Sequence, residues 1–153
     1  MERLQALKDV ITAAKIGYWA SQTDFQIKTI HAWIALAEKR DEEAIQLMRT
    51  AAEAEEASDK APVTPGNVVP LRGLLGEMLL ALNQPAQAFT EFERSLQRDP
   101  NRFRVVYSAS RAAEAAGNRQ AAREHYAKLQ TLTADHDTER PELAQATAFL
   151  AKP

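Results

Sequence analysis

The side chains best suited to chemistry are few and scattered along the chain. Its three histidines, His31, His125 and His136, lie too far apart in sequence to form a metal-ligand pair such as HExxH. No serine lies in a GxSxG or SxxK motif. Cysteine is absent, which excludes thiolate catalysis, disulfides and cysteine-based metal sites. We therefore expect no catalytic residue, no cofactor and no metal, and the chain is not expected to be an enzyme.

The remaining polar clusters have structural interpretations. We expect His31 on a packed helix face and His125 beside a core tyrosine. The run Asp135-His136-Asp137 has metal-ligating side chains, but adjacent loop residues rarely face one ion. The pair Glu42-Glu43 is placed to begin a helix, where carboxylates are favourable. The pair Glu55-Glu56 is expected on a solvated face.

Composition limits the class of protein. The chain has 153 residues, a net charge of −2, 5 glycines and 7 prolines, which fits neither long disorder nor a turn-rich β protein. The charge balance argues against a dedicated nucleic-acid binder. No apolar stretch is long enough for a secretory signal or a membrane-spanning helix. If Met1 is the natural start, the protein is expected in the cytoplasm.

Strong helix formers dominate the chain, and no segment alternates with the period of a strand. Gly17 is expected to end the first helix, and the prolines and glycine after Asp59 exclude a helix there. The expected helices cover residues 2–14, 18–39, 42–57, 69–82, 86–98, 102–116, 118–132 and 141–151. Short joints between them predict an all-α chain of antiparallel hairpins.

The chain contains an internal repeat. Ala88 and Ala122 lie 34 residues apart, as do Phe92 and Tyr126, and Asn83 and Gly117 in the turns. A third copy begins upstream, because Ala44 precedes Ala88 by 44 residues, which is 34 plus about ten inserted residues. Small residues let the two helices of a hairpin approach, and the aromatic residue one turn later fills the space between hairpins. Stacked hairpins of this kind form a solenoid.

This pattern resembles the tetratricopeptide repeat family. The resemblance rests on the 34-residue period, Leu75-Gly76, Ala88, Phe92 and the ending Asp99-Pro100-Asn101, and is best over residues 69–130. It implies an α-α superhelix forming one domain over 1–153. The parts are an N-terminal helical extension (1–24), a degenerate repeat (25–58), a Pro/Gly loop (59–68), two repeats (69–102 and 103–136) and a C-terminal capping helix (139–151). In the degenerate repeat, Lys39-Arg40 replaces the glycine turn.

The resemblance also implies which side chains line a concave groove. The mapped positions are Gln26, Thr29, Ile30, Trp33, Leu36 and Ala37; Pro70, Gly73, Leu74, Glu77, Leu80 and Ala81; and Arg104, Tyr107, Ser108, Arg111, Glu114 and Ala115. The candidate binding residues among them are Ile30, Trp33, Leu74, Glu77, Arg104, Tyr107 and Arg111. Aromatic residues and arginine often dominate binding energy in interfaces. For Trp33 we also consider the alternative that the N-terminal helices bury it, so that it does not line the groove.

The expected function is a non-enzymatic module that binds a peptide segment or partner domain in this groove. Co-chaperone members of the family clamp a terminal carboxylate, but here Thr29, Trp33, Leu74, Arg104 and Ser108 stand at the clamp positions. Only Arg104 suits that role, so chaperone tails are disfavoured. The alternative is a regulatory or partner-docking part of a larger protein whose catalytic part lies elsewhere. An RNA-binding repeat is disfavoured because the aromatics near the basic residues of 94–128 fall at core positions.

Overall fold

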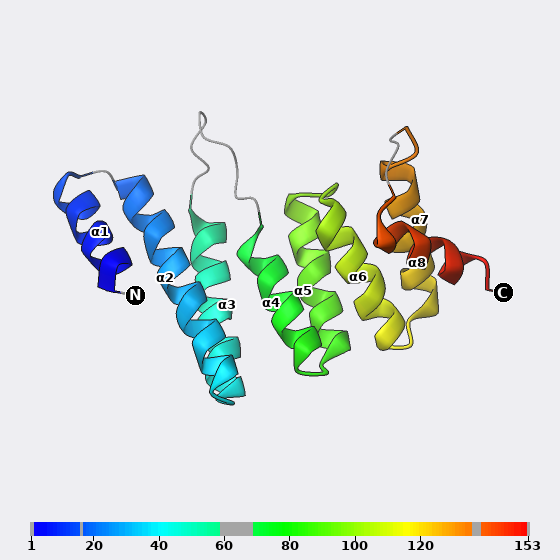
Figure 1. Ribbon diagram of the computed structural model, residues 1–153, viewed down its shortest axis with the longest axis horizontal. Helices are drawn as coiled ribbons and strands as arrows, with labels where there is room; N and C mark the ends of the chain where they lie inside the picture. Colours follow the sequence, from blue (N-terminus) through cyan, green and yellow to red (C-terminus); the bar gives the residue numbers. More distant parts are fainter. Residues whose placement is uncertain (1, 16, 59–68, 136–138, 153) are drawn as a thin grey trace. The chain divides into compact units, whose positions relative to one another are not determined.

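All regular secondary structure in the described part of the chain is helical. The computed structural model describes residues 2–15, 17–58, 69–135 and 139–152. Its helices, shown in Figure 1, are α1 (Glu2–Ala13), α2 (Gly17–Ala37), α3 (Asp41–Ala57), α4 (Leu71–Ala81), α5 (Pro85–Arg98), α6 (Phe103–Ala115), α7 (Arg119–Leu132) and α8 (Pro141–Leu150). No strand occurs in these ranges, so the all-α fold class is confirmed. The expected loop at 59–68, and His136 and Asp137, lie outside the described residues.

The helix ends lie within two residues of the sequence prediction, but one expected stop is wrong. Gly17 does not end the first helix, because it is the first residue of α2. The chain leaves α1 at Lys15, whose φ of 58° is left-handed, and the Lys15 amide donates to the carbonyl of Thr12. A lysine accepts this conformation where helix-end hydrogen bonds hold it, although glycine would do so with less strain. None of the described helices is long and apolar enough to cross a lipid bilayer.

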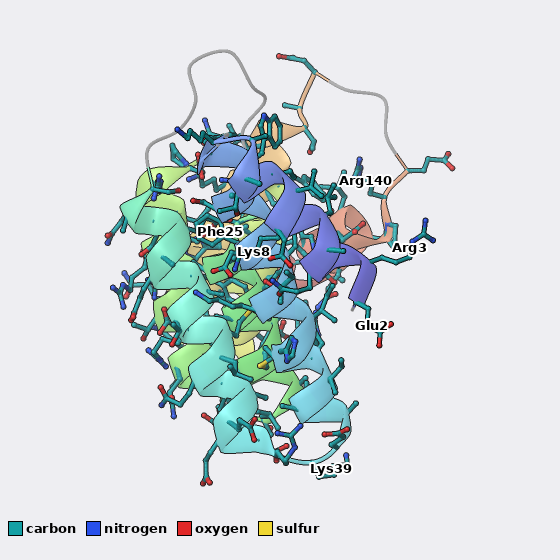
Figure 2. All side chains as sticks on the ribbon, turned by 90° about the vertical axis from the view of Figure 1, so that its left-hand side faces the viewer. Glu2, Arg3, Lys8, Phe25, Lys39 and Arg140 are labelled. Carbon is teal, nitrogen blue, oxygen red and sulfur yellow. The ribbon has the colours of Figure 1, made fainter. Side chains whose placement is uncertain are left out.

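The chain divides into two compact units, Met1–Leu75 and Gly76–Pro153, here called unit 1 and unit 2. In unit 1, α1 packs on α2 and α2 packs on α3. Phe25 of α2 packs with Ala51 and Ala52 of α3 and with Leu71 of α4. Figure 2 shows Phe25 and Lys8 within this unit, and Lys39 at the turn between α2 and α3. The alanines allow α3 to approach the phenylalanine closely, which builds the core of unit 1.

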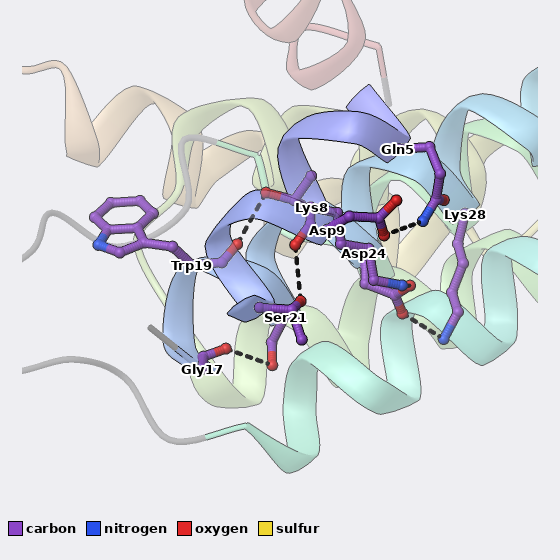
Figure 3. Close-up of polar contacts among 10 residues, drawn as sticks. Gln5, Lys8, Asp9, Gly17, Trp19, Ser21, Asp24 and Lys28 are labelled. Atoms are coloured by element: carbon purple, nitrogen blue, oxygen red, sulfur yellow. Dashed lines mark hydrogen bonds and ion pairs between the residues drawn. The ribbon is translucent and has the colours of Figure 1, made fainter. Parts of the chain in front are cut away.

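Asp24 of α2 binds lysines from two helices and ties α1 to α2 (Figure 3). Lys8 of α1 pairs with its Oδ1 atom, and the Lys28 Nζ atom lies 2.9 Å from its Oδ2 atom. Hydrogen bonds from Lys8 and then from Lys28 lower the pKa of Asp24 below its ordinary value of 3.8. Because the folded pKa lies below the unfolded one, the carboxylate stabilises the fold above the unfolded pKa. This contribution is lost as the pH falls through the folded pKa.

Replacing Asp24 with asparagine is expected to cost about 0.5–1 kcal/mol near pH 7, because the ion pairs are partly exposed to solvent. The difference from wild type should shrink as the pH falls through the folded pKa of Asp24. Urea unfolding at several pH values, with hydrogen exchange of α1, measures this effect. Asp9→Asn is the control, because Asp9 accepts a hydrogen bond from the neutral Gln5 at 3.0 Å. Parallel pH profiles for wild type and Asp24→Asn would contradict the assignment.

The start of α4 is held by a buried ion pair in unit 1. Arg72 is only 1% exposed, and its Nε atom donates to Glu56 Oε1 at 2.6 Å while its Nη2 atom pairs with Glu56 Oε2. The Leu71 amide donates to Glu55 Oε2 at 2.8 Å. The expectation that Glu55-Glu56 lies on a solvated face is therefore wrong. These two carboxylates connect the last turn of α3 to the first turn of α4.

In unit 2, α5 packs on α6, α6 on α7 and α7 on α8. Phe92 of α5 lies against Gly76 of α4, where a Cβ atom would stand 2.5 Å from the Phe92 Cε1 atom. Only glycine leaves room for the phenyl ring at this distance. This close contact explains why glycine stands at position 76.

Three hairpin turns share one local geometry. Their left-handed residues are Lys39, Asn83 and Gly117, with φ values of 63°, 57° and 77°. In each turn the next amide donates at 2.9 Å to the carbonyl five residues earlier, as Arg40 to Ala35, Gln84 to Leu79 and Asn118 to Ala113. The offsets are 44 and 34 residues, the same as in the sequence repeat. Lys39 therefore adopts the same left-handed turn conformation as Gly117, although lysine has a side chain and glycine does not.

The residues after these turns are also equivalent in burial. Ala44, Ala88 and Ala122 are fully buried five residues after each left-handed residue. One helical turn further on, Met48, Phe92 and Tyr126 are buried as well. The repeat in the sequence thus corresponds to a repeat in local structure. The division of the chain into repeats and a single domain stays a prediction.

Candidate binding pocket of unit 2

One face of α6 carries a stripe of polar side chains. The opposite face is apolar and buried through Val105, Val106, Ala109, Ala112 and Ala113, which fixes how the helix is rotated. Positions three and four residues apart share a helix face, which brings the polar residues Arg104, Tyr107, Ser108, Arg111 and Glu114 together, with Ala115 at the end of the same face. Helix packing therefore presents the predicted groove residues of this repeat on one side.

Glu77 of α4 binds this stripe. Ser108 is 2% exposed, and its Oγ atom donates to Glu77 Oε1 at 2.6 Å. The Arg104 Nε atom lies 3.8 Å from the same oxygen, while the Arg104 side chain is largely exposed. Glu77 therefore has both a hydrogen-bond donor and a positive charge beside it. The structure thus brings together Glu77, Arg104 and Ser108, which the sequence assigned to the groove.

Helix α8 adds a hydrogen-bond chain to the stripe. The Tyr107 hydroxyl donates to Gln145 Oε1 at 2.6 Å, and Gln145 Nε2 donates to the Tyr126 hydroxyl at 3.0 Å. Tyr126 in turn donates to Glu114 Oε2 at 2.9 Å. Burial, and then the Glu114 carboxylate, raise the pKa of Tyr126 above its ordinary value, so Tyr126 keeps its proton. These three hydrogen bonds hold the side chains of Glu114 and Tyr107 in place within the stripe.

A pocket of about 530 Å³ opens beside these groups. Its walls come from α4, the turn after it, the start of α5, α6 and α8. The lining residues are Glu77, Leu80, Ala81, Asn83, Pro85, Arg111, Glu114, Ala115 and Gln145. Six of these nine were mapped to the groove from sequence. Asn83, Pro85 and Gln145 were missed, because the turn, the start of α5 and α8 lie outside the groove positions that the resemblance supplies.

Arg111 is the positively charged group that lines the pocket. It is exposed, and its guanidinium carbon lies 5.7 Å from the centre of the Tyr107 ring. Among the described residues no carboxylate lies within ion-pair distance of it. Stacking on an aromatic face leaves the edge of a guanidinium free to donate hydrogen bonds.

The other three candidate residues belong to unit 1. Trp33 is 37% exposed, so the N-terminal helices do not bury it, and Trp19 on the same helix is 49% exposed. Ile30 is half-buried. Leu74 packs against the apolar cluster around Phe25 and contributes to the core. The four candidates of unit 2 meet at or beside one pocket, and these three do not form part of it.

The histidines do not assemble a site within the described residues. His31 is exposed, so the expectation of a packed face is wrong. The His125 Nε2 atom lies 3.0 Å from Glu93 Oε1, and its ring meets Phe89 edge to face. Across the described ranges, no three His, Cys, Asp or Glu side chains are arranged to hold a metal ion.

No known family profile matches the chain, and a search of curated proteins finds no relative. Among solved structures, the crystal structure of PcrH from Pseudomonas aeruginosa is similar, with a TM-score of 0.61 and 14% identity. The match covers 83% of this chain and 89% of PcrH. At this identity the likeness shows the fold alone. The chain therefore shares its helical fold with a protein of known structure.

Proposed function

We propose that the chain is a tetratricopeptide-like, non-enzymatic interaction module that binds a peptide segment or partner domain at the pocket of unit 2. The observation that carries this proposal is the meeting of Glu77 and Arg111, from different helices, at one open pocket. Leu80, Ala81, Pro85 and Ala115 supply apolar walls. Apolar walls with a few convergent polar groups are typical of binding sites.

Two observations support binding of protein in preference to catalysis or RNA. The polar groups that line the pocket include no nucleophile paired with a base. Arg111 lines the pocket and contacts the Tyr107 ring, and both residue types are common in protein interfaces. Phe92 and Tyr126 are buried, so neither is available for stacking on bases. The recurring turn geometry supports membership of a helical-repeat family.

The double variant Arg104→Ala plus Tyr107→Ala tests the proposal. Random dodecapeptides displayed on phage are selected on the immobilised full chain, and the selected peptides are made with a fluorescent label. We expect the double variant to weaken their binding by about tenfold or more in fluorescence anisotropy, because both side chains border the pocket. Its helical signal and melting temperature should stay near those of wild type.

The matched control is Thr90→Ala plus Arg94→Ala on the exposed face of α5, which should bind the peptides as wild type does. Failure to select any peptide, or equal binding by the double variant, would contradict the proposed function. Unfolding of the double variant would show that the groove assignment of these residues is wrong.

A further inference from the structure

The three charged side chains that line the pocket, Glu77, Glu114 and Arg111, differ in the contacts that they make within the protein. Glu77 accepts a hydrogen bond from Ser108 and has Arg104 at 3.8 Å. Glu114 accepts a hydrogen bond from the buried Tyr126 hydroxyl. Arg111 contacts the face of Tyr107, and in the described part of the chain no carboxylate pairs with it. The carboxylates of Glu77 and Glu114 each already accept a hydrogen bond, whereas the Arg111 guanidinium has no carboxylate partner among the described residues.

Resting on the function proposed above, we propose that Arg111 anchors an aspartate or glutamate side chain of the segment that occupies the pocket. A guanidinium can form two parallel hydrogen bonds to a carboxylate, and its stacking on Tyr107 restricts its orientation before binding. The largely exposed Arg104, on the same face of α6, adds a second positive charge.

The apolar side chains that line the pocket with Arg111 limit which residue of the partner can lie beside its acidic residue. Leu80, Ala81, Pro85 and Ala115 are short or medium apolar side chains. They suit a compact apolar neighbour, so the recognised element is an acidic residue next to a small apolar one. A lysine or arginine of the partner at this place would instead face the positive charge of Arg111, which disfavours a basic residue there.

The test uses the labelled dodecapeptides selected on the wild-type chain. We expect them to contain aspartate or glutamate, and replacing that residue by its amide should weaken binding to wild type by about tenfold. The same replacement should change binding to Arg111→Gln by less than about twofold, because the interaction it removes is already absent. Peptides with lysine at that position should bind Arg111→Glu better than they bind wild type.

Arg94→Gln on α5 is the matched control and should behave as wild type toward every peptide. Arg111 is exposed, so its variants should keep the wild-type melting temperature, which the same preparations can verify. Equal loss on wild type and Arg111→Gln would overturn the proposal, as would selected peptides rich in lysine that depend on Glu77 or Glu114. In either case peptide binding sensitive to Arg104 and Tyr107 would leave the proposed function standing, whereas absence of all peptide binding would reject both.

Discussion

Phe92→Ala is expected to destabilise unit 2 by about 3–5 kcal/mol, because it leaves a cavity where a buried phenyl ring stood. Phe92 is 1% exposed and lies directly against Gly76, which has no side chain that could fill the space. Urea unfolding followed by circular dichroism measures the loss. Hydrogen exchange should show it in α5 and in the part of α4 that begins at Gly76.

The same contact can be tested from its other side. Gly76→Ala places a methyl group 2.5 Å from the ring and should cost about 1–3 kcal/mol. Combined with Phe92→Leu, the two losses should be less than additive, because the shorter side chain removes the clash. Gly17→Ala is the control, since a Cβ atom at Gly17 meets nothing within 4 Å. If Gly76→Ala and Gly17→Ala were equally stable, the close packing described here would be wrong.

The buried ion pair of unit 1 should respond unequally to the loss of either partner. Glu56→Ala is expected to cost about 2–4 kcal/mol, because it removes the bidentate carboxylate from a guanidinium that is almost fully buried. Arg72→Met should cost about 1 kcal/mol or less, since methionine fills the space and Glu56, with a side chain 30% exposed, can be hydrated.

Urea unfolding of both variants measures this asymmetry. Glu53→Ala on the exposed face of α3 is the control and should stay within about 0.5 kcal/mol of wild type. A larger loss in Arg72→Met than in Glu56→Ala would mean that the arginine acts mainly through packing of its hydrocarbon stem.

Local patterns in the sequence were sufficient to predict the helices and the spacing of the repeat. Ala44, Ala88 and Ala122 recur because a small residue is needed where two helices cross, and this requirement is visible in residue type alone. Gly76 is predictable for the same reason. The face of α6 that borders the pocket follows from helical periodicity once the buried side is identified.

Features that depend on distant partners were not predicted. Arg72 and Glu56 carry charges of the kind that usually stay in water, and nothing local indicates that Arg72 is buried and paired with Glu56. Gln145 lies on α8, outside the repeat, so its bonds to Tyr107 and Tyr126 required the packing of three helices. Gly17 was expected to end the first helix, but Lys15 adopts the left-handed conformation there, as Lys39 does at the next turn. Hydrogen bonds at the helix ends compensate for their strain.

Both tryptophans of the chain lie on α2, and both are partly open to solvent. Indole emission responds to the polarity around the ring, so the native fluorescence spectrum is a local reporter of this one helix. Helices α5 to α8 contribute no indole signal. None of the residues that line the Arg111 pocket is a tryptophan, so labelled ligands are the appropriate probes there.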